Sequence, residues 1–210
     1  MIPHKDILPN YFILTIACIT VLAPFSIDAY LPALVNISLE LETSENLAQL
    51  TIAIFLLGFS LGPLIFGPLS DSLGRRKLII ISLIMFCIFS FLCSLSSNIY
   101  LLILFRFFQA VSGSVSTVCG RAAVADLFTG NELVKKLSLI GLMLNIAPLL
   151  APIIGGWINL LYGWRVIFLF IGIFGLLFVL LSFFMVTETL EPKKRVHFKI
   201  SQIFKIYLNI

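Results

Sequence analysis

Two ionisable residues stand inside long apolar stretches of the sequence. Asp28 lies within the stretch 26–32, and Arg106 lies within the stretch 104–109. A charge in a membrane span is costly, so an ionisable residue there is a functional candidate. Loss of water favours the neutral form of a carboxyl group, so Asp28 can take up and release a proton. We predict proton coupling by Asp28 and Arg106. The alternatives are an Asp28 that touches outside water and an Arg106 that reaches the headgroups.

Polar and small residues accompany these two charges. Gln109 and Gly113 follow Arg106 by three and seven positions, which places all three on one face of a helix. An unpaired guanidinium on that face would be costly, so the face should point at a polar cavity or an acid. We predict that Tyr30, Gln109, Gly113 and Asn145 line a substrate cavity. For Asn145, a packing hydrogen bond between helices is an equal alternative.

An acid and several bases gather where one apolar stretch gives way to the next. Glycines in the stretch 62–77 predict a tight turn at a water interface. Opposite charges in thin interfacial loops can hold one conformation of a transporter. The alternative is a set of solvated boundary charges that contribute little each. The predicted conformational gate comprises Gly67, Asp71, Gly74, Arg75, Arg76 and Asp126.

One later apolar stretch contains helix-disturbing residues. Pro148 and Pro152 remove helical hydrogen bonds, and Gly155 and Gly156 leave a smooth face. Small residues permit close contact with a neighbouring helix. We therefore expect a kinked helix that packs tightly on a neighbour.

Composition identifies the elements that position these residues. The chain has 210 residues, of which 60% are hydrophobic and only 11% are charged. A soluble domain is nearer half apolar and a quarter charged, so the composition predicts an all-α membrane protein. Six stretches have the roughly 20 apolar residues that a spanning helix needs. They cover about 10–32, 47–69, 78–97, 99–124, 136–160 and 165–187.

The rarer residues argue against other functions. The four cysteines form no CxxC pair, and the two histidines lie near the chain ends. This argues against a metal site, a cofactor and an intramembrane enzyme, since no histidine falls in a span. The net charge of +4 comes from bases in short loops, where they orient helices, and we expect no nucleic acid partner.

Two sets of residues repeat at one constant offset. Pro63, Gly67, Gly74 and Arg76 correspond to Pro152, Gly156, Gly163 and Arg165. Three helices in each unit would make the second unit inverted across the bilayer, as in secondary transporters. We predict three-helix repeats at 10–97 and 98–188.

The distribution of bases predicts the orientation. Lys5, the bases at 75–77 and 135–136, and those after 192 all fall on one side, which the positive-inside rule assigns to the cytoplasm. Both termini would then be cytoplasmic. We predict a cytoplasmic N-terminus at 1–9 and a cytoplasmic amphipathic tail at 189–210.

Together these motifs resemble those of the major facilitator superfamily. The stretch 67–77 is similar to its loop signature, and Asp126 matches the acid that pairs with that signature. Arg106 and Gln109 match a motif associated with proton coupling, with Ala110 in place of glycine. The stretch 151–156 is similar to the antiporter motif, in which Ala151 replaces the first glycine. The stretches 26–34, 121–128 and 163–165 resemble the bicyclomycin-resistance (Bcr/CflA) branch of drug:proton antiporters.

The resemblance implies one half of a larger protein. Members have twelve helices in two six-helix halves, with substrate between them, and this sequence resembles the N-terminal half. It implies a proton-coupled multidrug exporter of the bacterial inner membrane, driven by the proton gradient. Its partners would be the lipid bilayer, a small amphipathic drug and a second six-helix half. The alternatives are a sugar, peptide or metabolite permease of the same superfamily, or a membrane remnant that transports nothing.

Overall fold

A computed structural model describes residues 10–190, and these residues form helices joined by short connections. The elements are α1 (Asn10–Asp28), the short 3-10 helix η2 (Leu31–Ala33), α2 (Leu34–Glu40), α3 (Glu45–Leu73), α4 (Arg75–Ser94), α5 (Ile99–Leu127), α6 (Gly130–Tyr162) and α7 (Trp164–Met185). No strand occurs within this part of the chain. Residues 1–9 and nearly all of the predicted tail at 189–210 lie outside the described residues.

Six helical segments between residues 10 and 190 are long and apolar enough to cross a membrane. The first combines α1, η2 and α2, and the others are α3 to α7. The predicted all-α fold with six membrane-spanning helices is therefore confirmed. The first span is longer than the predicted 10–32, because the chain stays helical as far as Glu40.

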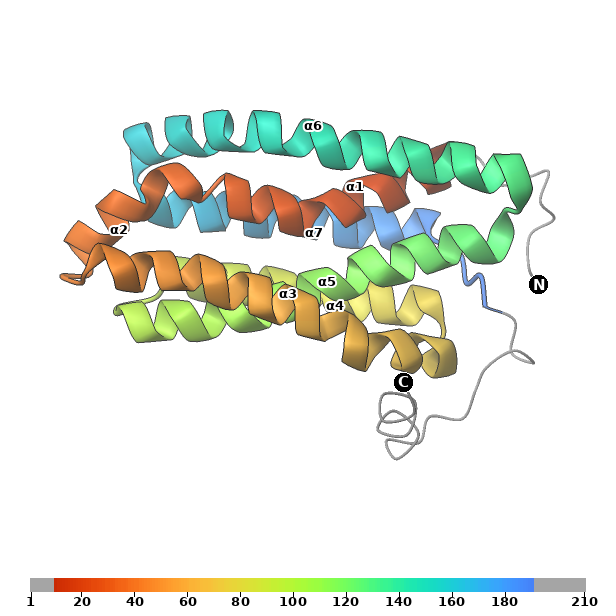
Figure 1. Ribbon diagram of the computed structural model, residues 1–210, viewed down its shortest axis with the longest axis horizontal. Helices are drawn as coiled ribbons and strands as arrows, with labels where there is room; N and C mark the ends of the chain where they lie inside the picture. Colours follow the sequence, from red (N-terminus) through yellow and green to blue (C-terminus); the bar gives the residue numbers. More distant parts are fainter. Residues whose placement is uncertain (1–9, 191–210) are drawn as a thin grey trace.

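The helices lie side by side along one axis and alternate in direction (Figure 1). One side of the bundle holds α1, α6 and α7, and the other side holds α3, α4 and α5. Contacts between α4 and α7 and between α1 and α5 join the two sides. The buried core lies along this junction, with Ile16, Phe86 and Phe168 fully enclosed. Side-chain caps from Ser44 and Asn98 start α3 and α5.

The turn between α3 and α4 is a single residue. Gly74 has φ 95° and ψ 151°, which a side chain would oppose, and helix resumes at Arg75. The turn is tight, as predicted, but the expected span ends at 69 and 78 are wrong, because both helices extend up to Gly74. Asp71 therefore lies in the last turn of α3, and Arg75 and Arg76 lie in the first turn of α4.

Gly163 joins α6 to α7 in the same way, with φ 84° and ψ 167°. The packing shows the same correspondence. The Gly58 and Gly62 positions of α3 touch α5, whereas Gly155 of α6 touches α1. Such an exchange of partners is what an inverted pair of three-helix units requires. The unit boundaries at 10–97 and 98–188 stay predictions.

Candidate functional site

Arg106 lies at the centre of the bundle with none of its surface exposed. Its guanidinium carbon lies 4.1 Å from the ring centroid of Phe55, 4.8 Å from that of Tyr30 and 5.5 Å from that of Phe168. These rings come from α3, the turn between α1 and η2, and α7. A cation over aromatic faces is attracted by the ring electrons, and the attraction strengthens where water is excluded.

A short hydrogen-bonded chain continues from the guanidinium. Arg106 Nη1 donates to Gln109 Oε1 at 2.8 Å, and Gln109 Nε2 donates to Ser90 Oγ of α4 at 2.7 Å. Beside it, the hydroxyls of Tyr30 and Thr51 share a hydrogen bond of 2.7 Å. The predicted face of Arg106 and Gln109 therefore contacts a polar side chain, Ser90 of α4. The sequence analysis did not predict Ser90.

Two donors of this buried side chain remain unused. Within residues 10–190, Arg106 Nε and Nη2 have no hydrogen-bond partner. A buried donor without a partner is expensive, and one on a cation is especially so. No acid within the described chain forms an ion pair with Arg106. We call Arg106, Gln109, Ser90 and the three rings the Arg106 centre.

The other residues predicted for coupling and cavity lie elsewhere. Asp28 ends α1 half-buried and forms no ion pair within the described part of the chain. A side chain at Gly113 would crowd Ala23 and Phe86, so the residue serves helix packing. Asn145 is exposed and bonds the Gly141 carbonyl of its own helix at 2.7 Å, rather than a neighbouring helix. The structure thus brings together Tyr30, Arg106 and Gln109. Within residues 10–190, no hydrogen bond or ion pair joins the side chain of Asp28 or Asn145 to them, and Gly113 lies one turn beyond Gln109 on α5.

Arg75 is the hub of a second cluster, at the Gly74 end of the bundle. Its Nη2 pairs with Asp71 at 2.6 Å, its Nε pairs with Asp126 at 3.2 Å, and its Nη1 donates to Ser70. The cluster links α3, α4 and α5, and the Arg75 side chain is only 10% exposed. The predicted contact of Asp71, Arg75 and Asp126 is therefore present, and its role as a gate stays a prediction.

The segment after α7 joins this Arg75 cluster. Glu188 accepts a hydrogen bond from the Arg75 backbone N–H at 2.9 Å, and Thr189 donates to Asp126 at 3.1 Å. Arg76 turns the other way and donates to the Phe183 carbonyl at 2.7 Å. A side chain at Gly67 would have no neighbour within 4 Å, and the Gly67 carbonyl accepts a hydrogen bond from Ser70 at 2.8 Å. Sequence reasoning missed Glu188 and Thr189, because a distant segment supplies them and only spatial contact reveals it.

A third polar cluster lies at the opposite end of the bundle. Glu40 accepts a hydrogen bond from Trp164 Nε1 at 2.6 Å and pairs with Arg165. Arg165 also donates to the Ser96 carbonyl at 3.2 Å. This Glu40 cluster fastens α2 and the α4–α5 connection to the start of α7. These residues come from segments far apart in the sequence, so the link was not predicted.

The small-residue face of α6 packs as expected. A side chain at Gly155 would overlap the Ala29 carbonyl oxygen, and a side chain at Gly156 would lie 3.9 Å from Pro32. Pro148 and Pro152 both lie within α6. The tight contact between α6 and the end of α1 is therefore confirmed, and it lies next to Asp28 in the chain.

Comparison with known proteins gives the family. The Major Facilitator Superfamily model matches residues 16–208, which is nearly the whole sequence. The chain belongs to the Major Facilitator Superfamily. It is a multi-pass membrane protein of a transporter family, and its relatives include transporters and resistance proteins.

Two curated relatives and one solved structure illustrate the match. The chain is 42% identical over 180 residues to the uncharacterized MFS-type transporter YdgK of Bacillus subtilis, covering 85% of this chain and 45% of the relative. It is 34% identical over 197 residues to a bicyclomycin resistance protein homolog of Haemophilus influenzae, covering 94% and 50%. The human organic anion transporter MFSD10 (TETRAN) superposes with a TM-score of 0.73 at 19% identity, covering 97% and 53%.

The chain matches only part of the length of each relative. The sequence spans about half the length of the curated relatives it matches. The likeness to the solved structure, at 19% identity, shows the fold alone. Because the chain spans only part of these relatives, the activity of the whole protein is a proposal.

Proposed function

We propose that this chain is the N-terminal six-helix half of a proton-coupled exporter of drug-like molecules. Its membership of the Major Facilitator Superfamily and its likeness to a bicyclomycin resistance protein homolog support the drug-export reading. The observation that carries the coupling is the Arg106 centre. A fully buried cation with two unused donors costs stability, and such a cost is tolerated where a function depends on it.

Asp28 is the proton carrier in this proposal. It is half-buried at the end of α1, two positions before Tyr30, whose ring faces Arg106. In this proposal, the charge of Arg106 tunes the carboxyl group of Asp28. A proton and a cationic drug then compete for the same carboxylate. That competition couples proton entry to drug export.

The Arg75 cluster is the proposed gate. It joins α3, α4, α5 and the segment after α7 at one end of the bundle. The distribution of bases in the sequence supports a cytoplasmic position for this end and for both termini. A closed cluster would hold the cytoplasmic side shut in the outward-facing form. For a bacterial protein, the membrane is the inner membrane.

Drug accumulation in everted membrane vesicles tests the proposal. We expect vesicles with an acidic lumen to accumulate ethidium, a lipophilic cation, and Asp28→Asn to abolish the proton-driven part. Glu45→Gln is the matched control, because Glu45 is an exposed acid at the start of α3. Undiminished proton-driven accumulation by Asp28→Asn would exclude Asp28 as the carrier.

If the reading frame that follows encodes six further spans, the assay uses both halves produced together. The proposal predicts transport by this pair. Transport by neither the chain nor the pair, with both correctly inserted, would favour a remnant that transports nothing.

A further inference from the structure

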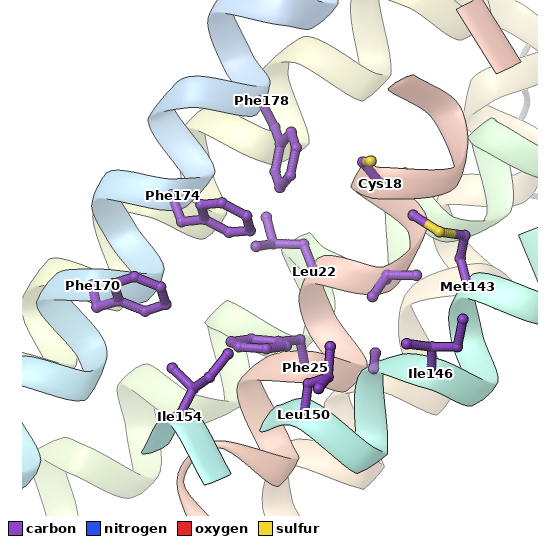
Figure 2. A pocket seen from close by; sticks show the side chains of 12 residues that line it. Cys18, Leu22, Phe25, Met143, Ile146, Leu150, Ile154, Phe170, Phe174 and Phe178 are labelled. Carbon is purple, nitrogen blue, oxygen red and sulfur yellow. The ribbon is translucent and has the colours of Figure 1, made fainter. Parts of the chain in front are cut away.

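An apolar groove lies between α1, α6 and α7, apart from the Arg106 centre. It has a volume of about 390 Å³ and twelve lining residues, none of them among the predicted site residues. Figure 2 shows Phe170, Phe174 and Phe178 along one side, with Leu22 and Phe25 of α1 in the middle and Met143 and Ile146 of α6 on the other side. We call this the α1–α6–α7 groove.

The lining is apolar throughout. Aliphatic, aromatic and sulfur-containing side chains form it, and none bears a charge or an amide, carboxyl or hydroxyl group. A site for a specific small molecule normally adds a few polar groups that fix its orientation. The α1–α6–α7 groove has no such group, so it selects its occupant by apolar surface alone. A cationic drug finds no carboxylate there.

The groove lies at mid-depth in the predicted spans. Its α6 residues fall between Met143 and Ile154 in a helix that runs from Gly130 to Tyr162. Its α7 residues fall between Phe170 and Phe178 in a helix that runs from Trp164 to Met185. Hydrocarbon tails, rather than water or headgroups, surround a bundle at this depth.

The groove is continuous with the exposed apolar surface of α6 and α7. Leu150 and Phe174 line it and are 50% and 38% exposed, so its walls reach the outside of the bundle. On α7, Ile173 and Leu177 stand beside these positions and are 63% and 48% exposed. An apolar chain from the bilayer can therefore enter without crossing a polar layer.

Helix packing explains why the groove is open. Gly155 of α6 touches Ala29 of α1 directly, whereas a side chain at Gly141, nearer the start of α6, would have no neighbour within 4 Å. On the other side of the bundle, side chains at Gly58 and Gly62 of α3 would both collide with α5. The groove residues of α6, Met143 to Ile154, lie between Gly141 and Gly155, so α6 contacts its neighbour closely at one end of the groove and has open space beyond the other.

We propose that the acyl chain of a membrane phospholipid occupies the α1–α6–α7 groove. An unfilled apolar gap loses dispersion contacts on every wall, and a tail restores them without burying a polar group. The bound acyl chain fills the space between α6 and the α1–α7 pair. This proposal does not depend on the transported substrate.

Photolabelling in lipid nanodiscs tests the proposal. The probe is a phosphatidylcholine with a diazirine at the middle of one acyl chain, and mass spectrometry maps its adducts on the 210-residue chain. Ordinary boundary lipid labels the outer faces of α6 and α7, which serve as an internal standard. We expect additional adducts at Val21–Phe25 of α1, where Leu22 is only 3% exposed. Absence of adducts there would overturn the proposal.

A matched pair of variants tests whether the probe reaches α1 through the α1–α6–α7 groove. Ala147→Phe places a ring in the groove, whereas Ala53→Phe makes the same change on an exposed position of α3. We expect the first to lower labelling of α1 severalfold relative to α7, and the second to leave it unchanged. Equal labelling in both would contradict the proposal.

A second probe tests the proposal on the wild-type chain, so the result does not depend on whether a variant folds. With the diazirine beside the headgroup, the wild-type chain should lose its adducts at Val21–Phe25, because the groove lies at mid-depth. Equal labelling by both probes would instead indicate access by a whole lipid or by detergent, and would overturn the assignment. Closure of the groove by a second six-helix half would appear as loss of α1 labelling when that half is present, and would also overturn it.

Discussion

At the scale of single residues, the central feature is a cation kept without an anion. Arg106 has aromatic rings on its faces and one amide oxygen as its hydrogen-bond acceptor. Rings and an amide stabilise a guanidinium less than a carboxylate does, so the fold carries the cost of this charge. Replacing Arg106 by an uncharged residue should therefore affect the stability of the fold and the transport activity differently.

Arg106→Met makes this difference measurable. Replacing a buried charge by an apolar side chain of similar length is commonly neutral or stabilising by about 1–4 kcal/mol. We expect the Tm of the purified protein to stay level or rise, while proton-driven drug accumulation is lost. Thermal unfolding in detergent and the vesicle assay provide the two readouts. A variant with a lower Tm and normal transport would show that Arg106 is a structural residue.

Sequence reasoning found part of this site. The spacing of Arg106 and Gln109 on one helical face is a local property, and their hydrogen bond confirms it. Phe55 and Phe168 come from helices distant in sequence, so no periodicity could select them from the 20 phenylalanines. Gly113 shared the face of Arg106, yet its neighbour on α1 leaves no room for a cavity.

At the scale of helices, small residues decide which pairs approach closely. Gly155 allows α6 to meet the end of α1 at Ala29, and Gly62 allows α3 to meet α5 at Ser114. The sequence predicted a packing face on α6 from Pro148, Pro152 and the glycines. It misplaced the helix ends near Gly74, because Asp71 and Arg75 satisfy one another and can remain helical at the interface.

Gly155→Ala tests the packing of α6, with Gly141→Ala as the matched control. The new methyl group at residue 155 would collide with the α1 backbone, and such overpacking costs about 1–3 kcal/mol. The same change at residue 141 meets open space and should be neutral or stabilising by about 0.5–1 kcal/mol. Thermal unfolding compares the two. Equal Tm values would mean that α6 and α1 are not held in this close contact.

At the scale of the whole molecule, polar clusters tie the two ends of the bundle. The Arg75 cluster joins four segments at one end, and the Glu40 cluster joins three at the other. The composition and apolar stretches were sufficient to predict six spans, and the resemblance of the motifs pointed to the family. The partners of Glu40, Glu188 and Thr189 could not be predicted, since each depends on contacts between segments far apart in the chain.

Proton and drug share Asp28 in the proposed mechanism. Binding of a cationic drug should then displace a proton from the protein, whether or not a second half completes the transport cycle. The direct measurement adds tetraphenylphosphonium to purified, weakly buffered protein over a series of pH values and records the pH change. We predict release approaching about one proton per chain in the wild type and none in Asp28→Asn. Drug binding without proton release in the wild type, or equal release from Asp28→Asn, would contradict this mechanism.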